Sequence, residues 1–250
     1  MVSKAVAKYV HALHLKKYRL RHEAFLVEGG KSVRELLSSG ILTERLIGTP
    51  EFLEKIRAEV PAGVPVEVVS EEELTRLSTL STNNTALAVA RLPPEKPLQP
   101  APGQLLLALD EVRDPGNVGT LIRLADWYGL AGVVCSDTCA DPWAPKTVVA
   151  TMGSFTRVPV WQRNLPEWLG GLPQELPVYG ADLHGDNVHR LTLRPTGVLV
   201  MGSESHGLTP PVEACLTQRL HIPGRGQAES LNVAVSAAIL LDNFYRHEVG

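Results

Sequence analysis

The sequence, 250 residues long, predicts an α/β protein with two domains. Short apolar segments alternate with helical ones along the whole chain, as in α/β architectures. The proline-rich stretch 93–103 interrupts this alternation and cannot sustain a helix or a sheet, so it is expected to be a linker. After it the apolar strands lack polar alternation, which indicates a parallel sheet covered on both faces. We therefore expect domains at 1–92 and 104–250.

The first expected domain is a small α/β unit. Its apolar segments predict strands at 24–28, 45–48, 66–69 and 86–90. Helical stretches are expected between them, near 31–39, 51–59 and 71–78. Ser70 and Glu73 have the spacing of a capping box, which favours a helix start at that point.

The second expected domain has longer buried strands, so we expect a doubly wound α/β unit. The strands are predicted at 104–110, 132–136, 157–161, 178–182, 198–202 and 219–222. The helix after the first of them carries a buried stripe and is expected to stop at Gly129. The stripe consists of Val118, Leu121, Ile122, Ala125 and Tyr128.

Charge is distributed unevenly along the chain. The formal net charge is only -3, which excludes a polycation that binds nucleic acid indiscriminately. The N-terminal end is nevertheless basic, and it interleaves histidines with lysines and arginines. Either a solvated helical face or a surface that contacts phosphates explains this end, and charge alone does not decide between them. The candidates for contact with nucleic-acid phosphates are Lys16, Lys17, Arg19, Arg21 and Lys31.

Three classes of feature are not expected. The three cysteines have no C-x-x-C spacing, which favours a reducing compartment over a disulfide framework or structural zinc. The histidines show no metal-ligand spacing, so no metal is expected. No apolar run is long enough to span a bilayer, so the expected location is cytoplasmic, without membrane attachment.

Segment 110–129 places two polar residues after a predicted strand. Asn117 falls in the expected first turn of the helix, and Arg123 lies off its apolar stripe. Ligands of α/β sheets bind at the carboxyl ends of strands, so both side chains could face a site. Taken singly, Asn117 is better explained as a helix cap, and Arg123 as a member of a surface ion pair with Asp126.

Segment 198–209 is a second buried strand that ends in a polar loop. Gly202 and Gly207 bracket Glu204, which places one carboxylate in a tight turn. The pattern is not the G-x-S-x-G elbow, so a serine hydrolase is disfavoured. A capped turn before the next helix is the simpler explanation.

Segment 222–239 leads from a strand through glycines into a helix of small residues. Gly224 and Gly226 are expected to permit positive φ and close approach of a ligand to the backbone. Glu229 holds the place of the third glycine of a dinucleotide fingerprint, so a Rossmann cofactor is disfavoured. An ordinary glycine turn remains the alternative for this segment alone.

Together, the three segments resemble the signature motifs of the SpoU-type RNA ribose 2′-O-methyltransferases of the SPOUT superfamily. The resemblance rests on Asn117 with Arg123, on Gly202-Ser-Glu-Ser-His-Gly-Leu, and on Ile222-Pro followed by Ser230-Leu-Asn-Val. Residues 17–33 look like the start of the family's N-terminal substrate-binding domain, and residues 151–160 are similar to another family segment. Nearly the whole chain is covered.

The resemblance implies a fold, a donor and a partner. It implies a ribosomal-protein-like α/β fold for the N-terminal domain and a deep trefoil knot in the C-terminal domain. It also implies S-adenosyl-L-methionine as cofactor and a homodimer whose active site lies at the subunit interface. The cofactor-binding residues it implies are Met201, Gly202, Gly207, Ile222, Ser230 and Leu231.

The activity it implies is methyl transfer to a ribose 2′-hydroxyl of structured RNA, with ribosomal RNA favoured over transfer RNA. The catalytic set it implies is Arg123, Asn117, Glu204 and Asn232. A guanidinium is a poor base, so we expect Arg123 to neutralise a phosphate and stabilise an alkoxide, while Glu204 or water accepts the proton. The alternatives are a non-catalytic RNA-binding or ribosome-assembly protein that retains the fold and, less favoured, a nucleotide-binding oxidoreductase.

Overall fold

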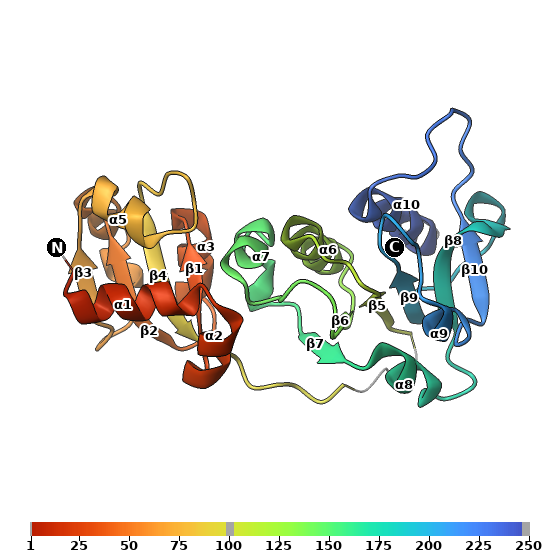
Figure 1. Cartoon of the computed structure of the whole chain (residues 1–250), viewed down its shortest axis with the longest axis horizontal. Coiled ribbons are helices and arrows are strands. Elements are labelled where there is room, and N and C mark those ends of the chain that lie inside the picture. Colours follow the sequence, from red (N-terminus) through yellow and green to blue (C-terminus); the bar gives the residue numbers. More distant parts are fainter. Residues whose placement is uncertain (1, 99–102, 247–250) are drawn as a thin grey trace. The chain divides into compact units, whose positions relative to one another are not determined.

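The computed structural model describes residues 2–98 and 103–246, which form two compact units (Figure 1). The first unit combines the chain up to residue 94 with residues 141–157. The second unit takes residues 95–140 and those from 158 onward. Of the proline-rich stretch 93–103, residues 99–102 lie outside the described residues.

The first unit is built on a mixed four-stranded sheet in the order β1-β4-β2-β3. Strand β4 is antiparallel to both β1 and β2, and β2 is parallel to β3. The strands are β1 (Ala24–Glu28), β2 (Thr43–Gly48), β3 (Val66–Val68) and β4 (Ala86–Arg91). The helices are α1 (Lys4–Leu13), α2 (Lys16–His22), α3 (Gly30–Leu37), α4 (Pro50–Lys55), α5 (Glu71–Leu77) and α7 (Pro145–Ala150), with 3-10 turns η1 (Arg57–Glu59) and η2 (Ser154–Thr156).

The second unit contains a six-stranded sheet in the order β10-β8-β9-β5-β6-β7, and every neighbouring pair is parallel. This confirms the predicted parallel sheet. The strands are β5 (Leu105–Leu109), β6 (Gly132–Ser136), β7 (Val160–Arg163), β8 (Val178–Asn187), β9 (Gly197–Met201) and β10 (Gln218–His221). The helices are α6 (Pro115–Trp127), α8 (Leu165–Gly170), α9 (Pro210–Glu213) and α10 (Val233–Tyr245), with the 3-10 turn η3 (Val188–Arg190).

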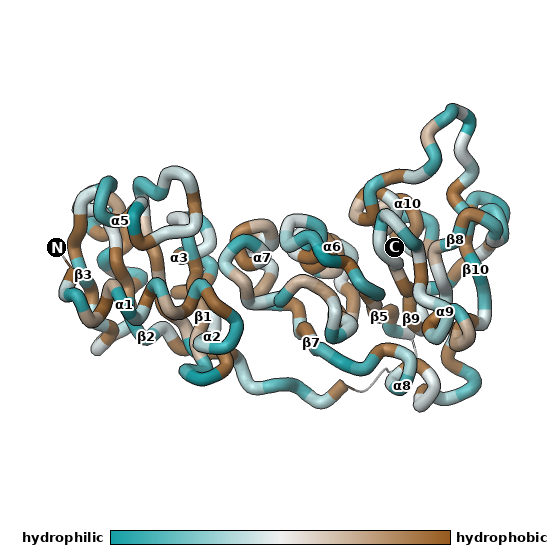
Figure 2. The backbone as a smooth tube through the Cα atoms, viewed as in Figure 1, coloured by the Kyte–Doolittle hydropathy of each residue, from teal (hydrophilic) through white to brown (hydrophobic). Residues whose placement is uncertain are grey.

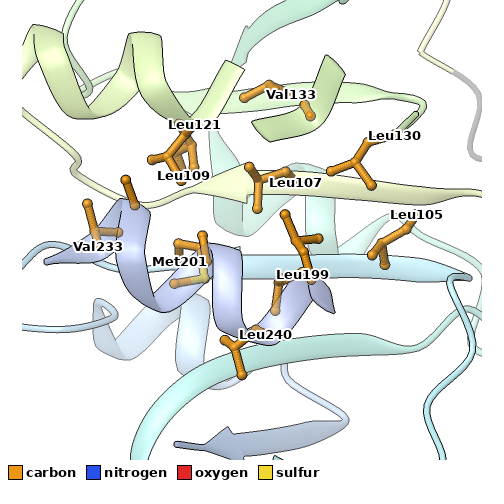
Figure 3. Packing of buried hydrophobic residues seen from close by; sticks show 14 of the residues in the cluster. Leu105, Leu107, Leu109, Leu121, Leu130, Val133, Leu199, Met201, Val233 and Leu240 are labelled. Carbon is orange, nitrogen blue, oxygen red and sulfur yellow. The ribbon is translucent and has the colours of Figure 1, made fainter. Parts of the chain in front are cut away.

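Alternate residues of β5 face two different apolar layers. Leu105, Leu107 and Leu109 belong to the core formed with α6 and α10 (Figure 3). Leu106 and Ala108 belong to the core formed with α8 and α9. Because both faces of this strand are covered, its sequence is apolar throughout. In Figure 2 the tube at β5 and β9 has the brown of hydrophobic residues.

Residues 141–157 pack within the first unit, although the sequence assigned them to the continuous segment 104–250. The ring of Phe25 on β1 lies 4.8 Å from that of Trp143 and 5.8 Å from that of Phe155, measured between ring centroids. Arg157 also forms an ion pair of 2.6 Å with Glu35 on α3. The strand expected from residue 157 therefore begins only at Val160.

Local signals in the first unit are largely realised. The Ser70 hydroxyl accepts a hydrogen bond of 3.2 Å from the backbone N–H of Glu73, which confirms the predicted start of α5. The Glu73 carboxylate accepts a bond of 2.6 Å from the backbone N–H of Val2, which ties the beginning of the chain to α5. The strand predicted at 24–28 is observed at those residues.

Candidate active site

The polar segments identified in the sequence follow β5, β9 and β10, at the carboxyl ends of parallel strands. Leu109 on β5 pairs with Met201 on β9, so the first two of these strands end side by side. Helix α6 begins with Pro115, and its cap is Asp114, whose carboxylate accepts a 2.8 Å hydrogen bond from the backbone N–H of Asn117. The interpretation of Asn117 as the helix cap is therefore wrong, and its side chain serves another purpose.

A chain of side-chain hydrogen bonds joins the three polar segments. The amide nitrogen of Asn232 donates a 3.0 Å bond to the amide oxygen of Asn117. The amide nitrogen of Asn117 donates in turn to the carboxylate of Glu204. The sequence predicted these three residues as site residues, and the structure brings them together.

Helix α10 fixes the direction of this chain. The Asn232 side-chain oxygen accepts bonds of 2.9 Å and 3.3 Å from the backbone N–H groups of Ala234 and Val235, so Asn232 is the helix cap. Backbone N–H groups can only donate, which leaves the Asn232 nitrogen as donor to Asn117. Asn117 must then present its own nitrogen outward. The Asn117 nitrogen is thus a donor directed at Glu204, whose carboxylate, when ionised, can accept a hydrogen bond but cannot donate one.

The loop that carries Glu204 is closed by backbone contacts. Ser203 and Gly207 exchange two backbone hydrogen bonds of 3.0 Å and 2.9 Å. A Cβ on Gly202 would lie 2.3 Å from the carbonyl carbon of Gly207, a separation that non-bonded carbon atoms do not reach. Gly207 itself has φ +68, in the left-handed region that glycine favours. This chain's own fold thus excludes a side chain at position 202 and favours glycine at position 207.

Asp110 is a structural residue that sequence reasoning did not single out. It is only 3% exposed, and its carboxylate accepts a 2.6 Å hydrogen bond from the backbone N–H of Thr209. Its own backbone N–H donates to the carbonyl of Met201 at 2.9 Å. Asp110 therefore fastens the loop of Glu204 to the end of β5. The available signal was a carboxylate directly after a wholly apolar strand.

Arg123 is not part of the hydrogen-bonded chain. It lies six residues after Asn117 on α6, which places it about 120° away around the helix axis. Its side chain is exposed and makes no hydrogen bond or ion pair within residues 2–98 and 103–246. The ion pair with Asp126 considered from the sequence is not formed by Arg123.

The candidate cofactor residues fall into two groups. Met201 is 2% exposed and its side chain belongs to the core (Figure 3), so only its backbone could face a ligand. Ile222 is half-buried against the same core. Ser230 and Leu231 lie in the exposed loop 223–232, drawn between β10 and α10 in Figure 1. Residues 223–231 are all exposed and, in the part of the chain that the structure describes, form no hydrogen bond.

The expected role of the glycines in this loop needs correction. Neither Gly224 nor Gly226 has a positive φ, and a Cβ on either would meet no atom of this chain within 4 Å. The chain's own fold therefore does not require glycine there. The backbone N–H and C=O groups of this loop have no partner in the described chain, and the apolar side chains of Ile222 and Leu231 lie beside them. Such a surface suits a ligand with both polar edges and apolar faces, and the adenosyl and amino-acid groups of S-adenosylmethionine fit this description.

The candidates for RNA contact differ in exposure. Lys16, Lys17, Arg21 and Lys31 are exposed, and the Lys17 ammonium lies 4.8 Å from the ring centroid of Tyr18. Arg19 is 3% exposed, and its guanidinium is bound to Asp141 at 2.5 Å and to the carbonyl oxygens of Leu13 and His14. The predicted contact of Arg19 with RNA is therefore wrong, because its guanidinium is buried and its hydrogen bonds are made within the fold.

The described residues contain neither a metal-binding cluster nor a membrane-spanning helix. No group of three or more His, Cys, Asp or Glu side chains in residues 2–98 and 103–246 could hold a metal ion. Over the same ranges, no helix has both the length and the apolar character needed to cross a bilayer.

Comparison with known proteins identifies the family. The model of the SpoU rRNA methylase family matches residues 104–242, and that of the MRM3-like substrate binding domain matches residues 4–88. The chain is 37% identical over 232 residues to the 23S rRNA (guanosine(2553)-2'-O)-methyltransferase RlmP of Bacillus subtilis, with 92% of this chain and 91% of that protein covered.

Two solved structures have the same fold over the full length. One is a protein assigned to the TrmH family of RNA methyltransferases from Porphyromonas gingivalis, with a TM-score of 0.88, 38% identity and 99% of both chains covered. The other is an AdoMet-bound rRNA methyltransferase from Sinorhizobium meliloti, with a TM-score of 0.87, 28% identity and coverage of 100% of this chain and 97% of that one. The chain belongs to the SpoU rRNA methylase family.

Proposed function

We propose that this protein methylates a ribose 2′-hydroxyl of ribosomal RNA with S-adenosylmethionine as donor. The observation that carries the proposal is the hydrogen-bonded chain from Asn232 through Asn117 to Glu204, which gathers the three family segments at one edge of the sheet. The name of the Bacillus subtilis relative supports ribosomal RNA as the substrate, and the AdoMet-bound neighbour supports the donor.

Glu204 is the proposed proton acceptor. One of its carboxylate oxygens is held by Asn117, and the side chain is exposed, so the second oxygen is open to a substrate hydroxyl. Bound S-adenosylmethionine supplies an electrophilic methyl group. Glu204 takes the proton of the ribose hydroxyl, which increases the negative charge on the oxygen that receives the methyl. Asn117 holds the carboxylate in place during this step.

Arg123 is proposed to bind a phosphate next to the target ribose and to stabilise the charge that develops on its oxygen. An arginine guanidinium remains ionised at any accessible pH, so it acts through charge and hydrogen bonds rather than as a base. Its exposure and lack of a partner within the described residues support a role toward RNA. An Arg123→Lys variant, which keeps the charge but loses the forked geometry, should lose most of its turnover.

The exposed basic side chains of the first unit are proposed to bind the RNA. Lys16, Lys17 and Arg21 lie on α2, and Lys31 lies in the first turn of α3. Lys31 also lines an open depression of about 610 Å³ together with Gly30 and Phe52. Each lost phosphate contact should weaken binding across sequences and reduce the salt dependence by about one unit of slope.

We further propose a cytoplasmic homodimer with a knotted C-terminal domain, as the family implies. Leu231 and Val235 are 46% and 49% exposed at the start of α10, which supports an apolar contact there. Light scattering of the purified protein tests the dimer, and an active monomer would contradict it.

Removal of the gene, followed by mapping of ribose methylation in ribosomal RNA, tests the function directly. One methylated ribose should disappear, and the wild-type gene should restore it, while a Glu204→Gln gene should not. Calorimetry with S-adenosylmethionine, with NAD as the control, tests the donor separately. If the purified protein binds S-adenosylmethionine but no methylated site is lost, a non-catalytic RNA-binding role replaces the proposed one.

A further inference from the structure

Trp127 is the most exposed of the large hydrophobic side chains in the described residues. It is the last residue of α6 and is 82% exposed. Within residues 2–98 and 103–246, its ring stacks on no other ring and its N–H group makes no hydrogen bond. Burial of a large apolar side chain usually stabilises a folded protein, and Trp127 does not contribute in this way because it stays in solvent. The side chain is therefore available to a ligand or partner.

The position of Trp127 on α6 relates it to Arg123. Four residues separate the two, which places them about 40° apart around the helix axis and about 6 Å apart along it. Thr120 lies on the same side, and all three side chains are exposed. A cation and an aromatic plane thus stand one helical turn apart on the helix that also carries Asn117.

A nucleotide matches this pair of groups. Its phosphate complements an arginine that has no acidic partner in the described chain, and its base offers a flat surface to an indole. Sequence-specific proteins commonly hold single-stranded RNA by stacking unpaired bases on aromatic side chains. A purely apolar partner would leave Arg123 without a counter-charge, so the pairing favours RNA over a hydrophobic protein surface.

We propose that Trp127 stacks on a nucleobase next to the methylated ribose while Arg123 binds the phosphate that connects the two nucleotides. This inference rests on the proposed function and adds a residue that positions the substrate. Trp127 does not touch the reacting atoms in this scheme. Its contribution is to hold the RNA strand in register with Glu204, so it acts through substrate affinity rather than through proton transfer.

The test compares Trp127→Ala and Trp127→Phe with the wild-type protein, using ribosomal RNA from the gene-deletion strain as substrate. Loss of one stacked base should raise KM for RNA between about 5-fold and about 150-fold, with kcat at saturating RNA changed by less than about 2-fold. Trp127→Phe, which retains a ring, should recover most of the loss. Leu183→Ala is the matched control, because Leu183 is 62% exposed on β8 and lies outside the three polar segments.

Two further measurements separate the possible results. Addition of RNA should quench tryptophan fluorescence in the wild type more than in Trp127→Phe, and this readout needs no turnover. Light scattering should give the same mass for all variants. The proposal is overturned if KM is unchanged in Trp127→Ala, or if that variant loses its association state, which would assign Trp127 to a contact between chains. A wild type that shows no methyl transfer but retains this quenching would refute the proposed function and leave the stacking intact.

Discussion

The amide nitrogen of Asn232 lies 3.0 Å from the amide oxygen of Asn117, although 115 residues separate them in the chain. Each side chain also makes a second contact: Asn232 caps α10, and Asn117 donates a hydrogen bond to Glu204. The site therefore depends on the correct return of the chain to the same edge of the sheet.

Loss of the amide of Asn117 should disable Glu204 without unfolding the protein. We expect Asn117→Ala and the isosteric Asn117→Asp to lower kcat by about 100-fold, because neither can donate a hydrogen bond to the carboxylate. Asn164→Ala is a matched control, since Asn164 caps α8 away from the site. Full activity of Asn117→Asp would show that shape, and not donation, is what matters.

An alanine at position 202 should disrupt the loop of Glu204. Its Cβ would lie 2.3 Å from the Gly207 carbonyl carbon and oxygen, so the loop must shift. We expect Gly202→Ala to lower affinity for S-adenosylmethionine at least about 10-fold by calorimetry, since misplaced groups lose binding energy. Gly170→Ala is the control, because a Cβ there meets nothing within 4 Å. Unchanged affinity would show that this loop is not part of the S-adenosylmethionine site.

Arg19 and Arg21 should have opposite phenotypes. Arg19→Ala leaves the Asp141 carboxylate without its buried partner, so we expect a loss of about 3–5 kcal/mol in the free energy of unfolding. Arg21→Ala should change stability by less than about 0.5 kcal/mol, because Arg21 is exposed. Urea denaturation measures both. In RNA binding the order should reverse, with the folded Arg19→Ala protein binding normally and Arg21→Ala binding more weakly.

Stability should fall in mild acid because of His14. Burial lowers the pKa of this imidazole below its usual 6.5, although its ring nitrogen lies 3.1 Å from the Leu77 carbonyl oxygen. The unfolded chain then binds the proton more readily than the folded one. The contribution of neutral His14 to the free energy of unfolding is therefore complete above pH 6.5, and it is lost as the pH falls below that value. Urea midpoints measured on either side of that pH should differ less in His14→Gln than in the wild type. An equal difference would contradict the assignment.

Local patterns predicted the strands well, because a buried strand needs only a short apolar run to reveal it. The segments 24–28 and 132–136 were predicted without error for this reason. The resemblance to a family predicted which residues belong to the hydrogen-bonded chain. It did not predict the hydrogen bonds themselves, because their direction and distance depend on how loops far apart in the sequence meet. The prediction for Arg19 was wrong because a positive charge in the sequence does not reveal that its guanidinium binds Asp141, 122 residues later, inside the fold. The predicted positive φ at Gly224 and Gly226 was wrong because glycine permits positive φ but does not require it.

The packing of residues 141–157 against β1 has a consequence for synthesis on the ribosome. Phe25 emerges early, but its ring contacts Phe155, which follows only after β5, α6 and β6 have been made. The N-terminal unit must therefore wait, with apolar side chains of β1 uncovered, for a delay on the order of seconds at usual rates of translation. A nascent chain stalled before residue 141 should be sensitive to protease and should recruit chaperones, whereas one stalled well beyond residue 157 should resist digestion.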